Sequence, residues 1–224
     1  MRVGVVGAGR IGGFVARQCA RAGHEVMVSF SRSPQTLEAL AREAGCRTGS
    51  PGDAAAFAEV VVLSVPWDVV DDTLVQAGSL VGRAVVDTTN PFGDEGFVEL
   101  PGGASAAAYN AARIPGAGHA KAFNTLTAGF QAAVPDRPID QRPAMFYAAD
   151  DAAAGEVTAE LVSACGFVPV ELPWQQVSLL EAPRQPGRVY GEEYSPEDAR
   201  RIATAARHDP DEAARLVDAL KRPG

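Results

Sequence analysis

The sequence is poor in the residues that build disulfide frameworks and metal sites. It has only three cysteines and three histidines in 224 residues. The cysteines are scattered and form no C-x-x-C pair: Cys19, Cys46 and Cys165. The histidines are equally dispersed: His24, His119 and His208. We therefore expect reduced thiols, as in a cytoplasmic protein, and no metal centre.

The sequence also lacks an excess of positive charge and any long hydrophobic run. Its formal net charge is −8, whereas binding to nucleic acid or to an anionic membrane needs clustered positive charge. No stretch approaches the roughly 18 uninterrupted apolar residues of a transmembrane helix. The apolar run at the N-terminus is too short for a signal peptide. These absences predict a cytoplasmic protein without nucleic-acid or membrane partners.

What the sequence does contain is a glycine-rich turn close to its start. Gly7, Gly9 and Gly12 follow a short apolar run at residues 3–6 and precede a helical pattern over residues 10–22. A second strand follows that helix. A strand, a G-x-G-x-x-G turn, a helix and a strand are the context in which this motif binds a dinucleotide.

Each glycine of the turn has its own physical reason. Gly7 allows a tight turn, Gly9 lets the backbone approach a pyrophosphate, and Gly12 lets the helix pack closely on the strand. The first turn of the helix, which contains Arg10 and Ile11, presents free N–H groups and a positive dipole end to the phosphates. The alternative is that the glycines serve only a tight strand-to-helix turn.

The residues after the second strand favour NADP over NAD. An NAD site usually has Asp or Glu there, which accepts a hydrogen bond from the ribose 2′-hydroxyl. This sequence has no carboxylate between Ser29 and Pro34, but it has Ser31, Arg32 and Ser33. A guanidinium group flanked by hydroxyls suits the 2′-phosphate of NADP. The alternative is that Arg32 is an ordinary solvated loop residue.

Strands and helices alternate along most of the chain. The continuous apolar run at 60–65 predicts a buried strand, and residues 84–87 and 118–122 predict two further strands, with helical patterns between them. This order predicts an α/β fold with a Rossmann-type, doubly wound parallel sheet. We expect residues 1–142 to form the NADP-binding domain. Residues 143–224 are expected to add a small C-terminal segment, first α/β and then helical, that contacts the substrate or a second subunit.

Polar and aromatic residues follow three of the predicted strands. Pro66 and Trp67 follow the first, residues 89–91 follow the second, and residues 121–125 follow the third. Ligands of such sheets bind beyond the carboxyl ends of the strands. We therefore expect the three clusters to line one nicotinamide pocket, although each taken alone is also common turn chemistry.

These motifs together resemble the NADPH-dependent deazaflavin (coenzyme F-420) reductases, a family of F-420-dependent NADP oxidoreductases. The resemblance covers residues 1 to about 181. The runs that carry it are Gly7–Gly13, Ser31–Pro34, Val65–Trp67, Asp87–Phe92, Lys121–Thr125, Gly166–Val170 and Leu179–Glu181. It implies hydride transfer between NADP(H) and a deazaflavin in a Rossmann-type enzyme. A homodimer is the default expectation for this class.

The resemblance also implies which residues bind the cofactor. The pyrophosphate would be held by Gly7, Gly9, Arg10, Ile11 and Gly12. The 2′-phosphate would be held by Ser31, Arg32 and Ser33. The nicotinamide would be bordered by Val65, Pro66, Trp67, Asn90, Pro91 and Asn124. Direct hydride transfer depends on positioning and on exclusion of water. This requirement agrees with the lack of an obvious acid–base constellation in the sequence.

Other acceptors and another class of function stay open. The protein is either the deazaflavin reductase, or an NADPH-dependent reductase of a flavin, a metal chelate, a quinone, or a small carbonyl or imine, or a non-catalytic NADP-binding sensor or partner protein. A carbonyl or imine needs a proton donor. The candidates, each also compatible with a structural role, are Lys121, His119, Tyr109, Tyr190 and Tyr194. Arg184 and Arg188 are candidate contacts for an anionic substrate.

Overall fold

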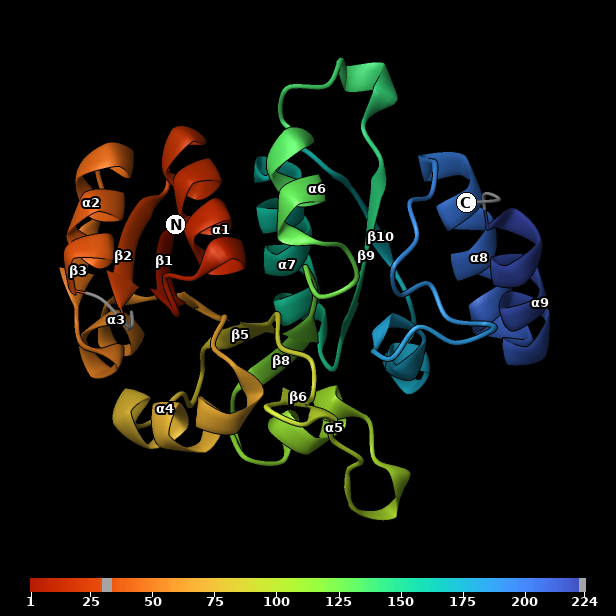
Figure 1. The fold of residues 1–224 in the computed structure, drawn as a ribbon, viewed down its shortest axis with the longest axis horizontal. Helices are drawn as coiled ribbons and strands as arrows, with labels where there is room; N and C mark the ends of the chain where they lie inside the picture. Colours follow the sequence, from red (N-terminus) through yellow and green to blue (C-terminus); the bar gives the residue numbers. More distant parts are fainter. Residues whose placement is uncertain (30–33, 222–224) are drawn as a thin grey trace.

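The computed structural model describes residues 1–29 and 34–221. Within them, eight strands form one sheet in the order β3-β2-β1-β4-β5-β8-β9-β10 (Figure 1). The strands are β1 (Arg2–Val6), β2 (Glu25–Ser29), β3 (Arg47–Gly49), β4 (Val60–Leu63), β5 (Ala84–Asp87), β8 (Gly118–Lys121), β9 (Ala144–Ala149) and β10 (Val168–Glu171). The two halves of a Rossmann sheet therefore meet between β1 and β4, where the strand order reverses.

Helices cover both faces of this sheet (Figure 1). One face carries α1, α2, α6 and α7, and the other carries α3, α4 and α5, with α8 and α9 over β9 and β10. The helices are α1 (Arg10–Arg21), α2 (Pro34–Ala44), α3 (Pro51–Phe57), α4 (Val70–Ala77), α5 (Ala106–Ala111), α6 (Ala128–Ala133), α7 (Ala152–Ala164), α8 (Pro196–His208) and α9 (Pro210–Leu220). In the described part of the chain, none of these helices combines the length and apolarity needed to span a bilayer.

The core follows from the alternation of side chains along each strand. Successive residues of a strand point to opposite faces of the sheet. Val60 and Val62 pack in the cluster under α1, whereas Val61 and Leu63 pack in the cluster under α3 and α4. A continuously apolar strand such as β4 is thus buried on both faces, as a parallel sheet covered on both sides requires.

The predicted Rossmann-type doubly wound sheet is confirmed, with one difference at its far edge. The first six strands run parallel, but β9 pairs with β8 in the antiparallel sense, with Lys121 opposite Ala148. β10 in turn runs parallel to β9. The sheet continues past residue 142, and the expected domain boundary at that position stays a prediction.

Several helices begin at a residue whose side chain caps the first turn. Ser50 caps α3 and forms a capping box with Asp53. The side chains of Ser195 and Asp209 accept hydrogen bonds from the first turns of α8 and α9. Such caps satisfy backbone N–H groups that have no partner within the helix.

Two segments have more structure than their sequence predicts. The glycine- and proline-rich stretch at 93–103 predicts a loop, but a small antiparallel hairpin begins there, with β6 (Phe92–Gly93) and β7 (Gly96–Phe97). Residues 128–133, for which the sequence pattern predicts no element, form α6 with Thr127 as its N-cap. Both segments lie at the carboxyl edge of the sheet or next to it, where irregular sequence gives weak signals.

Candidate active site

The glycine turn has the geometry that a dinucleotide site requires. Gly7 has a φ of 111°, in the region that favours glycine. A Cβ atom on Gly7 would lie 2.1 Å from the Ser64 carbonyl oxygen, and one on Gly12 would lie 1.9 Å from the Gly7 carbonyl oxygen. A Cβ atom on Gly9, by contrast, would meet no described atom within 4 Å. The first and third glycines are therefore needed for packing, while the second faces open space.

This open space fits a dinucleotide pyrophosphate. Gly9 and Arg10 are exposed at the start of α1, which is long enough to present an effective positive dipole end. Val65 lies against Gly7 on the side of β4. The residues expected at the 2′-phosphate, Ser31, Arg32 and Ser33, lie outside the described residues, so their role stays a prediction.

A cavity of about 230 Å³ lies at the carboxyl edge of the sheet. Ile11 from the first turn of α1 borders it, together with residues that follow two separate strands. The residues lining it include Ile11, Thr88, Asn90, Phe123, Asn124 and Tyr190. The structure therefore brings together three of the predicted cofactor residues, Ile11, Asn90 and Asn124, which are far apart in the sequence.

The other residues expected beside the nicotinamide lie elsewhere. Pro66 is exposed, and Trp67 packs against Tyr109 of α5 with 6.0 Å between ring centroids. Neither is among the residues that line the 230 Å³ cavity. Pro91 is buried and borders a neighbouring cavity of about 380 Å³. Their roles at the cofactor stay predictions.

Two asparagines, Asn90 and Asn124, join the strand ends at this cavity. Asn90 Nδ2 donates to the Asn124 main-chain oxygen at 2.9 Å, and Asn124 Nδ2 donates to Asn90 Oδ1 at 3.2 Å. Asn124 Nδ2 also donates to the Leu180 carbonyl oxygen at 2.8 Å. Asn124 Oδ1, however, is buried and has no partner among the described residues. An unsatisfied acceptor of this kind suits a ligand that brings an N–H donor, as the nicotinamide carboxamide does.

Phe123 has a strained backbone beside these asparagines. Its φ is 60°, an uncommon value for a bulky residue, although its side chain is completely buried. Gln131 of α6 holds this conformation, because its side-chain amide donates to the carbonyl oxygens of Phe123 and Leu126 at 2.8 Å. Local strain that surrounding contacts maintain is typical of functional sites.

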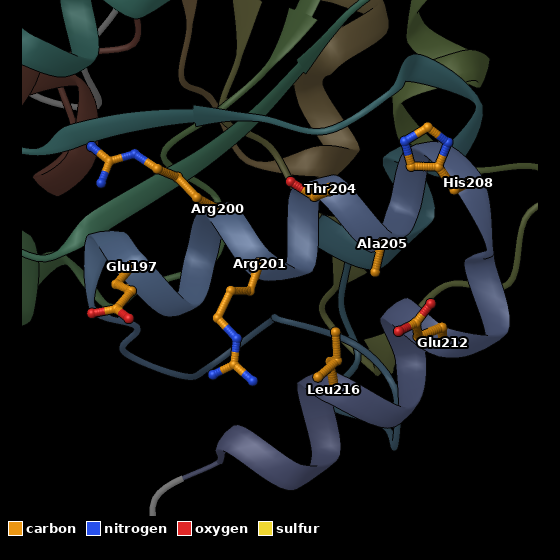
Figure 2. A pocket seen from close by; sticks show the side chains of 8 residues that line it. All are labelled: Glu197, Arg200, Arg201, Thr204, Ala205, His208, Glu212 and Leu216. Atoms are coloured by element: carbon orange, nitrogen blue, oxygen red, sulfur yellow. The ribbon is translucent and has the colours of Figure 1, made fainter.

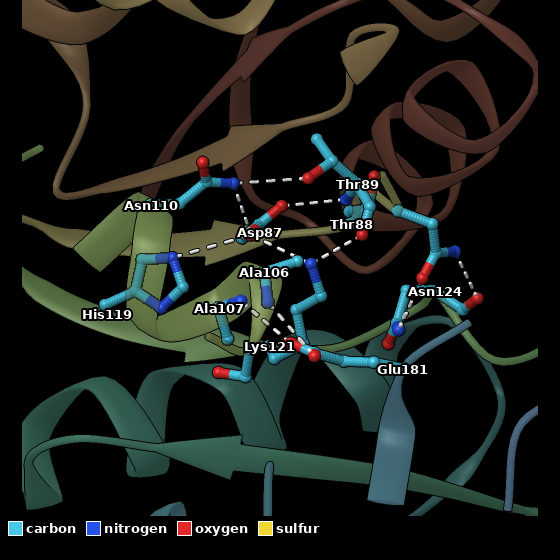
Figure 3. Close-up of polar contacts among 12 residues, drawn as sticks. Asp87, Thr88, Thr89, Ala106, Ala107, Asn110, His119, Lys121, Asn124 and Glu181 are labelled. Carbon is cyan, nitrogen blue, oxygen red and sulfur yellow. Dashed lines mark hydrogen bonds and ion pairs between the residues drawn. The ribbon is translucent and has the colours of Figure 1, made fainter. Parts of the chain in front are cut away.

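Lys121 belongs to a buried polar cluster behind the cavity (Figure 3). It lies opposite Asp87 in the register of β5 and β8. Lys121 Nζ donates to Asp87 Oδ2 at 2.9 Å and also to the Thr89 carbonyl oxygen. Asn110 of α5 donates to Asp87 Oδ2 at 2.9 Å, and the Thr89 backbone N–H donates to Asp87 Oδ1 at 2.7 Å. The cluster thus holds the turn that carries Asn90.

Asp87 stays ionised in this cluster. Burial is the largest single effect and would raise the pKa of its carboxyl group, but the positive charge of Lys121 and the interactions with His119 and Asn110 together outweigh it. Hydrogen bonds strengthen the lowering, so the pKa of Asp87 lies well below its usual range. His119 Nε2 is 3.6 Å from Asp87 Oδ2, which is too long for a good hydrogen bond, and we attribute the shift chiefly to Lys121.

The two first candidates for acid–base catalysis are therefore closed off from the cavity. The side chains of Lys121 and His119 are 0% exposed. Neither residue lines the 230 Å³ cavity, and the His119 ring packs edge-on against Trp174 at 5.5 Å. Their surroundings favour a structural role, which the sequence left as the alternative.

Glu181 has a role that the sequence did not indicate beyond the Leu-Leu-Glu run. Its buried carboxylate accepts hydrogen bonds from the backbone N–H groups of Ala106 and Ala107 at 3.0 and 2.8 Å (Figure 3). The segment after η4 (Trp174–Leu180) thereby binds the start of α5. Two contacts, Glu181 to α5 and Asn124 to Leu180, attach the end of η4 and the residue after it to the site.

The remaining candidates differ in their environments. Tyr194 is buried and its hydroxyl donates to the Val217 carbonyl oxygen, whereas Tyr190 lines the 230 Å³ cavity. Arg184 forms an ion pair with Glu192. Arg188 donates to the carbonyl oxygens of Glu181 and Ala182 at 3.2 Å and borders the 380 Å³ cavity.

A larger hollow of about 550 Å³ lies between α8 and α9 (Figure 2). Its walls carry exposed charged side chains of both signs, such as Arg200, Arg201 and Glu212. No residue from a strand end or from the glycine turn contributes to it. It therefore has none of the features of the cofactor site.

Comparison with known proteins indicates the family that the first part of the chain resembles. Residues 2–91 match a family described as NADP oxidoreductase, coenzyme F420-dependent. This match contains the glycine turn, β4, β5 and Asn90. It confirms the predicted resemblance over this part of the chain. The expectation of an NADP-dependent oxidoreductase with NADP(H) as its cofactor is confirmed at the level of this family.

Solved structures extend the similarity beyond residue 91. A hypothetical protein from Sinorhizobium meliloti is 28% identical with a TM-score of 0.75, over 87% of this chain and 95% of that chain. A protein provisionally assigned as an F420-dependent NADP reductase, from Arthrobacter sp. FB24, is 25% identical with a TM-score of 0.66, over 76% and 84% of the two chains. No curated protein matches the sequence.

More distant structures share the fold alone. A reductive aminase from Aspergillus terreus in complex with NADPH and ethyl-5-oxohexanoate is 21% identical with a TM-score of 0.58. The similarity covers 80% of this chain but only 57% of that enzyme. Rossmann-type folds support many chemistries, so the acceptor has to be argued from the site itself.

Proposed function

We propose that this protein transfers a hydride between NADP(H) and a deazaflavin, coenzyme F420. The observation that carries the proposal is the shared cavity, in which Ile11 of the glycine-turn helix meets Asn90 and Asn124. A dinucleotide bound by its pyrophosphate at Gly9 would extend along the carboxyl edge of the sheet to this cavity. The family match over residues 2–91 supports both the cofactor and the reaction class.

The residues of the chain would bind and orient the two reactants. The backbone at Gly9 and the first turn of α1 would hold the pyrophosphate, and Arg32 the 2′-phosphate. Asn124 would accept a hydrogen bond through its unpartnered Oδ1. When bound, NADP(H) supplies or receives the hydride at its nicotinamide ring. The protein contributes orientation and exclusion of water, and neither role requires an acid–base group beside the ring.

The acceptor would approach from the neighbouring cavity. This cavity of about 380 Å³ is lined in part by Pro91, which follows Asn90 in the chain. Ala182, whose backbone N–H contacts Asn90 Oδ1, also lines it. Arg188 borders it with a half-buried guanidinium group that has no carboxylate partner among the described residues. A guanidinium group at this position suits an acceptor that carries a negative charge.

Steady-state oxidation of NADPH tests the proposal. The purified full chain should bind NADPH more tightly than NADH and oxidise it when coenzyme F420 is added. A flavin, a ferric chelate, a quinone and an imine are offered in turn as competing acceptors. If NADPH is oxidised with only one of these compounds and not with coenzyme F420, that compound is the acceptor. Tight NADPH binding without turnover on any acceptor would identify a non-catalytic NADP-binding protein.

The expected homodimer stays a prediction. Sedimentation velocity with and without NADPH measures the mass of the particle directly. A monomer at micromolar concentration in both conditions would contradict it.

A further inference from the structure

Tyr190 is the only ionisable side chain among the described residues that line the 230 Å³ cavity. Its neighbours there include Thr88, Asn90 and Asn124. None of the residues that the structure describes forms a hydrogen bond with its hydroxyl group, although the residue is half-buried. Tyr190 therefore borders the place where the nicotinamide and its acceptor are expected to meet, and its hydroxyl group is not engaged by any described residue.

The backbone on both sides of Tyr190 is anchored. The Val189 N–H donates to the Leu179 carbonyl oxygen at 3.0 Å, and the Gly191 N–H donates to the Thr125 carbonyl oxygen at 2.8 Å. Val189 is completely buried. These bonds hold the loop against the carboxyl edge of the sheet, so the position of Tyr190 is set by the fold.

The other candidate proton donors are not available to this cavity. Lys121 and His119 are sealed in the cluster with Asp87. The Tyr194 hydroxyl already donates to a main-chain oxygen, and Tyr109 packs on Trp67 at the surface of α5. Of the groups considered, Tyr190 alone combines a free hydroxyl with a place in the cavity wall.

We infer that Tyr190 is a catalytic proton donor for a second class of acceptor, a small aldehyde or ketone. This inference rests on the proposed binding of NADPH at the glycine turn. The carbonyl carbon gains a hydride from NADPH, which becomes NADP⁺, and the C=O π electrons move to oxygen. The oxygen takes the proton of the Tyr190 hydroxyl. The resulting phenolate regains a proton from water, and the product is an alcohol.

The size and the chemistry of the cavity favour this class. A volume of about 230 Å³ is below the roughly 300 Å³ lower limit of pockets for drug-sized ligands. It leaves little space beyond a nicotinamide ring. Reduction of a carbonyl places negative charge on one oxygen, which needs a proton at that atom. A reduced deazaflavin spreads its added electrons over a conjugated ring and does not depend on a donor at one position.

Burial also raises the pKa of Tyr190 above its usual value. The phenol therefore keeps its proton throughout the neutral range. An alkoxide is a much stronger base than a phenolate, so the proton transfer from Tyr190 is favourable.

The test uses the full chain with NADPH and four probes: acetaldehyde, acetone, cyclohexanone and benzaldehyde. We expect the wild-type protein to reduce at least one of them. Tyr190→Phe should lower kcat for that probe at least a hundredfold, in the range typical of a lost general acid. Tyr147→Phe removes a hydroxyl of the same kind from β9, outside the cavity, and serves as the matched control, with kcat within twofold of wild type.

A binding measurement separates proton donation from structural damage. Isobutyramide is an unreactive analogue with a carbonyl oxygen, and its affinity is measured in the presence of NADP⁺. Tyr190→Phe should weaken this affinity about three- to tenfold, the effect of one lost hydrogen bond. The affinity for NADPH alone, followed by tryptophan fluorescence, should change less than threefold.

The outcomes distinguish this inference from the proposed function. Failure of the wild-type protein to bind NADPH would remove the proposed function and this inference together. NADPH binding without reduction of any of the four probes would overturn only the role of Tyr190. Equal losses by Tyr190→Phe with the carbonyl and with coenzyme F420 would also overturn it, because a residue that merely positions the ring affects both acceptors.

Discussion

Asn90 and Asn124 hydrogen bond to each other in both directions across the carboxyl edge of the sheet, at 2.9 and 3.2 Å. They follow β5 and β8, which are neighbours in the sheet but 34 residues apart in the chain at this point. Asn124 also contacts Leu180 at the end of η4, and Asn90 contacts Ala182 just after it. The hydrogen bonds of this pair therefore hold three separate segments of the chain together around the candidate nicotinamide site.

Replacement of Asn124 should weaken both the fold and cofactor binding. Asn124→Ala removes two donated hydrogen bonds and leaves the Leu180 carbonyl oxygen without its partner, which costs about 1–2 kcal/mol of unfolding free energy. It also removes the free Oδ1, so the affinity for NADPH should fall about fivefold or more. Urea unfolding and fluorescence titration measure the two effects. Ser163→Ala, on the exposed face of α7, is the control, and an unchanged NADPH affinity in Asn124→Ala would contradict the assignment.

Gly9 and Gly12 should respond in opposite ways to the same added methyl group. Gly9→Ala places its Cβ in open space, so the unfolding free energy should change by less than about 0.5 kcal/mol. Its affinity for NADPH should fall at least tenfold, because the methyl group lies where the pyrophosphate approaches. Gly12→Ala should lose about 3 kcal/mol of stability, since its Cβ would meet the Gly7 carbonyl oxygen. Normal NADPH binding by Gly9→Ala would show that the cofactor lies elsewhere.

Lys121 should prove essential to the fold and not to proton transfer. Lys121→Met leaves the buried Asp87 carboxylate without its ion-pair partner, a change that costs about 3–5 kcal/mol. The double variant Asp87→Asn with Lys121→Met should recover part of this loss, which chemical denaturation would reveal as a coupling energy. A Lys121→Met protein of normal stability that has lost only turnover would restore Lys121 as a candidate catalytic residue.

The ionised Asp87 should make stability depend on acid pH. Its pKa in the folded protein lies below the unfolded value of about 3.9. Its contribution is therefore fully present above about pH 5 and is lost as the pH falls through the folded pKa. Urea unfolding should show about the same difference between wild type and Asp87→Asn at pH 6 and pH 5, and a smaller difference at pH 4 and again at pH 3. A difference that is constant with pH would show that the Asp87 pKa is not lowered by folding.

Arg32 should decide the choice of cofactor. The sequence places it where the 2′-phosphate of NADP is expected, and it lies outside the described residues. Arg32→Ala should weaken NADPH binding by roughly 1.5–3 kcal/mol, as expected for a charge-assisted contact, and should leave NADH binding little changed. Equal losses for NADPH and NADH in a titration of each would reject this role.

Much of the fold could be predicted because its signals are local. The apolar run of β4, the glycine turn and the capping residues Ser195 and Asp209 each depend on neighbours in the chain. The direction of β9 could not be predicted, since an apolar strand has the same pattern in either direction. The short α6 was missed for a related reason, because six residues give too few turns for a periodic pattern.

The site was predictable only in part, because the residues that contact one another there are distant in sequence. The strand ends indicated Asn90 and Asn124 correctly as neighbours of one cavity. The ion pair of Lys121 with Asp87 appears only once the register of β5 and β8 is known, since both side chains then lie on the same face. Glu181 bridges 74 residues to reach Ala107, and the sequence contains no local feature that announces this contact.

β9 and β10 form one edge of the sheet and run antiparallel to the other strands. They determine what happens when the chain is truncated before them. A fragment that stopped at residue 142 would leave β8 as an unprotected border strand, with free N–H and C=O groups ready to pair with another chain. The same fragment would lose Glu181 and Leu180, the partners that hold α5 and Asn124 in place. Limited proteolysis near the end of the sheet should therefore abolish cofactor retention and cause precipitation at the same time.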